Sequence, residues 1–319
     1  MMERGIKKVM MIHASRSTFI LLLLILLKSC SSPELDFERT ALIVDRQQIE
    51  ILTAHELYEY FLTSKPTYRK AIVEKIKTEF QKDSEFPGLL ETIDAEIKPD
   101  EHLREEVEIL KSIDIESIVN STFQNLVKEL PGPDTKVLFI PANPAYKEIY
   151  ESYGIGIHAI TVGEGKIIVS INPTIRNWEQ LLPYTLAHEY HHSVWISRNF
   201  KTAELTPLEY LILEGRADAF AKRLYPETRH PFLKRLKSDQ ENTVWNLLKP
   251  ELRKENSFMN DQLMSGADNI PTGSVYSIGF NIIESFKSNN PHISDLELID
   301  MNPEQVLMLS KYEDVVKER

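Results

Sequence analysis

Two histidines and one glutamate stand at a spacing that suits metal-assisted hydrolysis. His188 and His192 lie four residues apart in the run Leu-Ala-His-Glu-Tyr-His-His, and Glu189 follows the first of them. On a helix, residues four apart lie one turn apart, about 40° from each other on one face. Two imidazoles placed in this way can bind one tetrahedral zinc ion, and the neighbouring glutamate can take a proton from water. The pattern predicts a helix that carries His188 and His192 as zinc ligands and Glu189 as general base.

A third ligand is expected from farther along the chain. The extended form of the motif, with a glycine and a third histidine, is absent because Trp195 and Arg198 occupy those positions. The run Thr-Pro-Leu-Glu at 206–209 has the signature of a helix start, with a threonine cap, a proline in the first turn and a glutamate three residues after the cap. We expect this second helix to end near Leu224, before Pro226.

The middle of this second helix carries two carboxylates next to small residues. Glu214 and Asp218 are one turn apart, and Gly215 and Ala217 permit close approach of another helix. We expect Glu214 to complete the zinc site and Asp218 to accept the free N–H of a ligating histidine, which fixes its tautomer. The alternative is a carboxylate pair on a surface helix. Other candidates for the third ligand remain open: Glu204, Glu209 and His230.

A further helix is expected to begin after Gly273. Its first turns contain Tyr276, Ser277 and Gly279, and the two small residues permit close packing. A tyrosine at this place can hydrogen-bond the tetrahedral intermediate of amide hydrolysis, which makes Tyr276 a candidate catalytic residue. The alternative is a tyrosine that only packs in the core.

The bulk composition is that of a globular protein. The chain has 319 residues, of which 42% are hydrophobic and 27% charged, and this length supports one large domain or a catalytic domain with a helical appendage. The formal net charge is −11. This acidic balance argues against nucleic acid as a partner.

The amino-terminal segment has the pattern of an export signal. Four basic residues precede the apolar run Phe19–Leu27, which is too short to span a bilayer but suits the apolar region of a secretory signal. The sequence Leu-Lys-Ser-Cys that ends at Cys30 resembles a bacterial lipoprotein box, from which Lys28 departs. We expect cleavage before Cys30 and acylation of its thiol, so that the protein is exported and anchored by lipid to the extracytoplasmic face of a bacterial membrane. The alternative is a plain signal peptide or an uncleaved anchor.

Apolar periodicity divides the remaining chain into two parts. From Asp36 to about Leu130, apolar residues recur at spacings of three and four, which predicts helices. The run Pro-Gly-Pro-Asp at 131–134 marks a break. Short apolar runs with period two follow and predict strands at 137–140, 155–161 and 166–171.

The last two of these expected strands form a hairpin around residues 162–165, which precedes the histidine helix in the chain. Gly154 and Gly156 leave backbone accessible there, so a substrate chain can add to that edge, unless the hairpin is simply part of the core. His158 is a lone histidine on a strand, and we expect it to have a structural role.

With these residues in place, the chain resembles the gluzincins, the thermolysin-like class of zinc metallopeptidases. It resembles more closely a bacterial family of predicted zinc-dependent proteases that is classed as a domain of unknown function. The shared features are the His-Glu-Tyr-His-His run, the Glu-Gly-x-Ala segment and a later Tyr-x-x-Gly, and they cover roughly residues 137–287. The resemblance implies three zinc ligands, His188, His192 and Glu214, a base, Glu189, and supporting roles for Asp218 and Tyr276, the latter as oxyanion stabiliser.

The resemblance completes the expected architecture. We expect an α+β fold, mostly helical, with a small, mainly antiparallel sheet packed on a zincin-like pair of active-site helices. The expected regions are a lipoprotein signal peptide at 1–29, a helical region at 30–131 and a zincin-like metallopeptidase domain at 132–319.

The expected activity is hydrolysis of a peptide bond in a peptide or protein substrate, with one catalytic zinc ion. One rival is a lipid-anchored zinc-binding or chaperone-like module without turnover. The presence of Glu189 argues against this rival, because ligation alone does not need that residue. A second rival is hydrolysis of a non-peptide amide, which uses the same metal chemistry.

Overall fold

The structure of the chain is a computed structural model that describes residues 36–94, 97–175, 177–201, 204–230 and 236–312. The chain divides after Asp36, and every element described below lies in the unit from Phe37 to Arg319. The expected signal segment and Cys30 lie outside the described residues. No helix of the described part is both long and apolar enough to cross a membrane.

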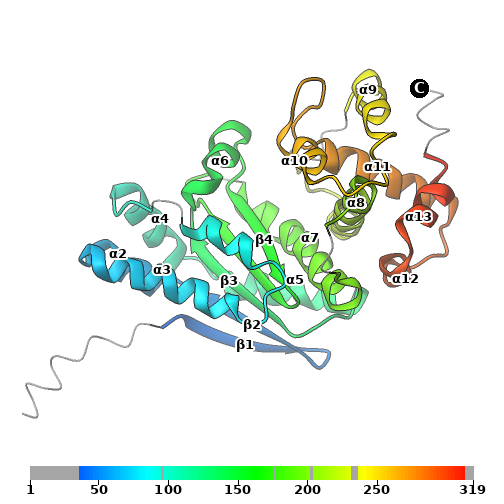
Figure 1. Cartoon of the computed structure of the whole chain (residues 1–319). Coiled ribbons are helices and arrows are strands. Elements are labelled where there is room, and N and C mark those ends of the chain that lie inside the picture. The colour runs from blue at the N-terminus through cyan, green and yellow to red at the C-terminus, as the bar shows by residue number, and fades with distance from the viewer. Residues whose placement is uncertain (1–35, 95–96, 176, 202–203, 231–235, 313–319) are drawn as a thin grey trace, which may run out of the picture. The chain divides into compact units, whose positions relative to one another are not determined.

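A five-stranded mixed sheet forms the centre of one half of this unit (Figure 1). Its strands are β1 (Glu38–Val44), β2 (Gln47–Thr53), β3 (Thr135–Pro141), β4 (Ile157–Gly163) and β5 (Lys166–Ile171), in the spatial order β1-β2-β3-β5-β4. The pairs β1–β2 and β4–β5 are antiparallel, whereas β2–β3 and β3–β5 are parallel. The α+β class and the helical majority are confirmed, but the sheet is mixed rather than mainly antiparallel.

The expectation that residues 36–130 are helical is wrong for the first two elements. Residues 38–53 form the antiparallel hairpin β1–β2. Its turn is made by Asp45 and Arg46, both with positive φ (45° and 77°), a geometry that sequence usually signals with Asn-Gly or Asp-Gly. Because β2 pairs with β3, the sheet joins strands from both sides of the expected boundary between residues 131 and 132.

Helices cover both faces of the sheet. The remaining amino-terminal elements are helical as expected: α2 (His55–Thr63), α3 (Pro66–Gln81), η1 (Pro87–Asp94), α4 (Glu101–Lys111) and α5 (Ile115–Glu129). One face of the sheet forms a single buried cluster with α5 and with α7 (Trp178–Asn199). On the other face, α4 contacts β3, and Glu79 of α3 pairs with Arg39 and Lys136 of the sheet.

The two helices expected to carry the chemistry are present. Helix α7 continues through Pro183 without a break. Helix α8 (Pro207–Leu224) begins with the predicted capping box, in which Thr206 and Glu209 bond each other's backbone N–H. The short connection between α7 and α8 makes these helices neighbours, and they pack against each other.

The carboxyl-terminal helices form a second core around α8. They are α9 (Ser238–Leu248), α10 (Ser257–Ser265), α11 (Ser274–Asn289), α12 (Asp295–Asp300) and α13 (Pro303–Ser310). Figure 1 shows them gathered around α8, away from β1. Helices α8 and α11 meet at their backbones, because a Cβ added to Gly215 would lie 2.3 Å from the carbonyl carbon of Gly279. The close packing expected from these small residues is confirmed.

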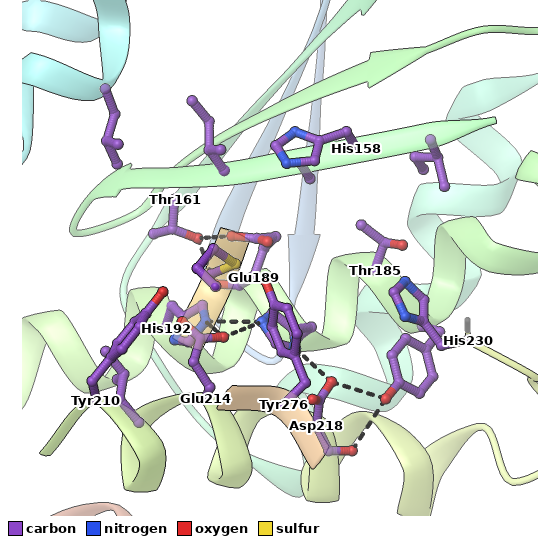
Figure 2. A pocket seen from close by; sticks show the side chains of 18 of the residues that line it. His158, Thr161, Thr185, Glu189, His192, Tyr210, Glu214, Asp218, His230 and Tyr276 are labelled. Atoms are coloured by element: carbon purple, nitrogen blue, oxygen red, sulfur yellow. Dashed lines mark hydrogen bonds and ion pairs between the residues drawn. The ribbon is translucent and has the colours of Figure 1, made fainter. Parts of the chain in front are cut away.

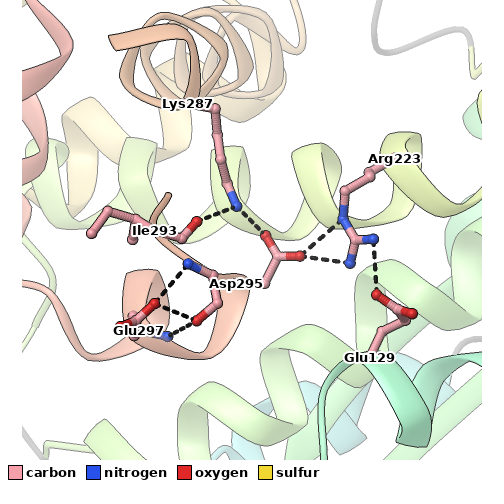
Figure 3. Close-up of polar contacts among 7 residues, drawn as sticks. Glu129, Arg223, Lys287, Ile293, Asp295 and Glu297 are labelled. Atoms are coloured by element: carbon pink, nitrogen blue, oxygen red, sulfur yellow. Dashed lines mark hydrogen bonds and ion pairs between the residues drawn. The ribbon is translucent and has the colours of Figure 1, made fainter. Parts of the chain in front are cut away.

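A polar network joins α8 to both halves of the unit (Figure 3). The Arg223 guanidinium, at the end of α8, donates to Glu129 of α5 at 3.0 Å and to Asp295 of α12 at 2.7 Å. Lys287 of α11 donates to the same Asp295 carboxylate at 2.6 Å. Arg223 is 43% exposed, so these ion pairs contribute little stability individually, but they connect the end of α8 to α5 and α12.

Candidate active site

The predicted metal ligands converge between α7 and α8. His188 and His192 lie one turn apart on α7 and form a group with Glu214 of α8. Figure 2 shows Glu214 next to His192. Glu214 Oε2 lies 3.2 Å from His188 Nε2 and 3.5 Å from His192 Nε2, and the two Nε2 atoms are 2.9 Å apart. In a tetrahedral zinc site with bonds of about 2.0–2.1 Å, ligand atoms lie roughly 3.3–3.4 Å from each other. The three side chains therefore fit one zinc ion with shifts of a few tenths of an ångström.

Asp218 contacts His188, the first histidine of the motif. Its Oδ1 lies 3.0 Å from Nδ1 of His188 and can accept the N–H there, which turns Nε2 of His188 towards Glu214. Tyr184 O–H donates to the same Oδ1 at 3.0 Å. Asp218 is 2% exposed, so this carboxylate orients the ligand in a water-poor setting, where the hydrogen bond is stronger.

The carboxylates control the charge of this cluster. Burial lowers the pKa of His188, but the Asp218 and Glu214 carboxylates outweigh that effect and raise it well above its ordinary value. Burial raises the pKa of Glu214, but His192 and His188 outweigh burial and hold it far below its usual range. Glu214 is thus anionic at neutral pH, which suits the binding of a divalent cation.

Glu189 is held by the edge strand of the sheet. The hydroxyl of Thr161, on β4, lies 2.7 Å from Oε2 of Glu189 and 2.9 Å from its backbone oxygen. Glu189 points towards this strand and lies apart from the His192 imidazole (Figure 2). It is 8% exposed and lines the cavity described next. The structure therefore places Glu189 next to the metal-ligand cluster but outside it.

A cavity of about 700 Å³ opens onto the cluster. It lies between β4, α7, α8 and the start of α11, and its walls include the aromatic side chains of Tyr146, Tyr153, Trp195 and Tyr210. An apolar cavity with a few converging polar groups is the usual form of a substrate site.

Two tyrosines face the cluster from the helical side. The ring centroid of Tyr276 lies 6.2 Å from that of His188, and the backbone contact between Gly215 and Gly279 fixes the position of the helix that carries it. Tyr210 lines the cavity one turn before Glu214. Burial raises the pKa of both phenols, so each keeps its proton and can donate a hydrogen bond.

The other candidate ligands do not join this group. His230 stacks on Tyr184 at 5.2 Å, and Glu209 is engaged in the cap of α8. Among the described residues, the group that can hold a metal consists of His188, His192 and Glu214.

His158 stacks on Tyr146 with ring centroids 3.8 Å apart, and it also lines the cavity. Burial, with a smaller effect of His230, lowers the pKa of His158 to about 4. This imidazole is neutral at pH 7 and packs as an aromatic wall, in agreement with the structural role expected for it.

One expectation about the strand edge is wrong. The backbone at Gly154 and Gly156 is occupied, because Asn177 accepts the N–H of Gly156 at 3.0 Å and donates to the carbonyl of Gly154 at 2.8 Å. Asn172 also donates its N–H to the carbonyl of Gly156 at 2.9 Å. The free edge of the hairpin begins later, on β4 itself.

Sequence reasoning missed three residues of the site. Tyr184 and Tyr210 each stand four residues before a predicted site residue, His188 and Glu214, so helical periodicity gives a signal for both. Thr161 has no such signal, because its contact depends on how β4 packs on α7.

Comparisons with known proteins find a family model and a curated relative. A family model for predicted Zn-dependent proteases, DUF2268, matches residues 115–308, more than half of the chain, which include all the converging residues. The uncharacterized protein YjfC of Bacillus subtilis is 26% identical over 157 residues, which are 45% of this chain and 51% of YjfC, so the match spans about half of that relative. No solved structure matches. The chain belongs to the DUF2268 family of predicted Zn-dependent proteases.

Proposed function

We propose that this protein is a zinc-dependent metallopeptidase of the gluzincin type. The observation that carries the proposal is the convergence of His188, His192 and Glu214 within 4.8 Å of one another, with Glu189 directly beside them on α7. A pure binding site needs the three ligands, whereas a buried, hydrogen-bonded carboxylate next to them is what hydrolysis adds.

In this mechanism each group of the chain has one task. Zinc, when bound, supplies a Lewis acid that polarises the scissile carbonyl and makes water more acidic. Glu189 takes a proton from the attacking water at its carboxylate and later delivers it to the leaving amine. Thr161 holds that carboxylate towards the cavity. Asp218 keeps His188 in one tautomer, and the Tyr276 hydroxyl donates to the developing oxyanion.

The substrate is proposed to pair with the free edge of β4. This strand is at the edge of the sheet, and residues 157–161 line the cavity beside Glu189. Main-chain hydrogen bonds to an edge strand hold an extended peptide regardless of its side chains. Such pairing favours a peptide over a small non-peptide amide, since the latter has no backbone to offer.

The protein is also proposed to be exported and anchored by a lipid on Cys30. The basic leader, the short apolar run and the Leu-Lys-Ser-Cys sequence support this proposal. Catalysis then takes place on the extracytoplasmic side of a bacterial membrane.

The test is cleavage of a denatured protein mixture by the purified full chain in detergent. We expect cleavage with zinc, loss with a chelator and recovery when zinc is restored. Glu189→Gln keeps the shape of the side chain but removes the base, so it should keep zinc while activity falls roughly 10²–10⁴-fold. Zinc retained with unchanged hydrolysis would contradict the mechanism. Zinc bound with no cleavage by the parent would favour a binding module.

A further inference from the structure

The segment Ser84–Leu89 lies against the carboxyl end of β4 and contributes Phe86 and Leu89 to the lining of the cavity. Phe86 donates its backbone N–H to the carbonyl of Val162 at 3.1 Å, and the Ser84 hydroxyl donates to the same oxygen. The Glu85 carboxylate accepts the N–H of Glu164 at 2.8 Å. These bonds use the backbone at the end of β4 that an added strand would need, so pairing along this edge stops at Val162.

The same segment reaches across to the end of α7. The ring of Phe86 packs edge-on against Phe200, with centroids 5.3 Å apart, and Phe200 directly follows the last residue of α7. Phe86 and Leu89 line the cavity together with Trp195 and Ile196 of α7. Strand β4 and helix α7 run in the same direction, because Thr161 bonds Glu189 and Gly165 bonds Ser193. The segment therefore bridges their ends and forms an apolar wall.

The base lies very near this wall. Thr161, which holds Glu189, is the residue immediately before Val162, where the free edge stops. One strand residue spans about 3.3 Å, so the space between the base and the wall fits roughly one or two substrate residues. In the opposite direction the cavity continues along β4 to Ile157, with Tyr146 and Tyr153 in its lining.

We propose, on the basis of the proposed function, that this enzyme removes short pieces from a chain end. The substrate extends freely towards Ile157 but has no more than about two residues beyond the scissile bond on the side of Val162. Because the wall is made by Phe86, Leu89, Trp195 and Ile196, the released residues are apolar or aromatic.

The experiment uses the zinc-loaded full chain and a denatured protein mixture, with products sequenced by mass spectrometry. We expect released pieces of one or two residues, rich in apolar side chains, and absent with Glu189→Gln. Pieces from amino ends would mean that the substrate pairs antiparallel to β4, and pieces from carboxyl ends would mean parallel pairing. Either result supports the inference that the wall near Val162 limits the length of the released piece. Internal cuts with long products on both sides contradict this inference and leave the proposed function standing. The absence of any cleavage that depends on Glu189 contradicts both.

A pair of variants tests the wall itself. Leu89 is 39% exposed, so Leu89→Ala should fold, and it should lengthen the released pieces. Phe86→Ala should lengthen them further, because it removes the larger part of the wall. Leu247→Ala, at a leucine of α9 that is 43% exposed and outside the cavity lining, is the matched control and should leave product lengths as in the parent. Unchanged product lengths in folded Leu89→Ala and Phe86→Ala would overturn the proposed role of the wall.

Discussion

The backbone contact between Gly215 and Gly279 makes a quantitative prediction about the metal site. Gly215→Ala adds a Cβ that lies 2.3 Å from both the carbonyl carbon and the carbonyl oxygen of Gly279. Both atoms belong to the backbone of α11, so rotation of a side chain cannot relieve the clash. Apolar contacts need about 3.5 Å, so α8 and α11 must separate by roughly 1 Å.

The separation of the two helices should lower both the stability of the fold and the affinity for zinc. Because the clash is with backbone atoms, overpacking should cost about 2–3 kcal/mol, the upper part of the usual range, and the better helix propensity of alanine offsets about 1 kcal/mol of that. The net loss of about 1–2 kcal/mol lowers Tm by roughly 2–8 °C in a unit of this size. Glu214 directly precedes Gly215, and metal sites tolerate shifts of only about 0.2 Å. We therefore expect zinc affinity to fall by about 10-fold or more.

Thermal denaturation and zinc competition with a chromophoric chelator measure both effects. Gly88→Ala is the matched control, because a Cβ at Gly88 meets nothing within 4 Å. If Gly215→Ala melts and binds zinc like the parent and like Gly88→Ala, then the helix contact does not set the position of Glu214, and the reasoning is wrong.

Three further predictions concern the supporting carboxylate, a buried glutamate and the anchor. Asp218→Asn should reduce zinc affinity or activity about 10–100-fold, measured in the same competition and cleavage assays; an unchanged affinity and rate would show that the bond to His188 is not needed. Burial raises the pKa of Glu106 to about 7, so the folded state binds a proton that the unfolded state has lost, and stability falls as pH rises from about 4.5 through 7. Urea unfolding at pH 5 and pH 8 should show the parent losing up to about 3 kcal/mol more than Glu106→Gln, and equal losses would refute this. Cys30→Ser should abolish acylation and release the protein from membranes in a fractionation experiment, whereas a mutant that stays membrane-bound with its leader intact would favour an uncleaved anchor.

The local signals in the sequence were sufficient for the helices that carry the site. The four-residue spacing of His188 and His192 fixes their common face, and the capping box at Thr206 fixes the start of α8. These signals depend on residues close together in the chain, so they do not depend on how the distant parts of the chain pack. The same spacing also reaches Asp218, one turn beyond Glu214, which the structure places against His188.

The parts that sequence could not predict depend on long-range pairing. The hairpin β1–β2 was missed because its turn uses Asp45 and Arg46 at positive φ instead of the usual Asn-Gly or Asp-Gly signal. The contact of Thr161 with Glu189 joins residues 28 positions apart, and the bond of Phe86 to Val162 joins residues still farther apart. No local pattern encodes such contacts, since they arise only when the sheet and α7 pack together.

The central claim is that His188, His192 and Glu214 together hold one zinc ion. The most direct test is zinc content by mass spectrometry, combined with X-ray absorption on the purified full chain. We predict one zinc per chain with two imidazole nitrogens at about 2.0–2.1 Å and a carboxylate oxygen, and loss of most of this zinc in Glu214→Ala. Full zinc occupancy with an unchanged absorption spectrum in Glu214→Ala would contradict the account.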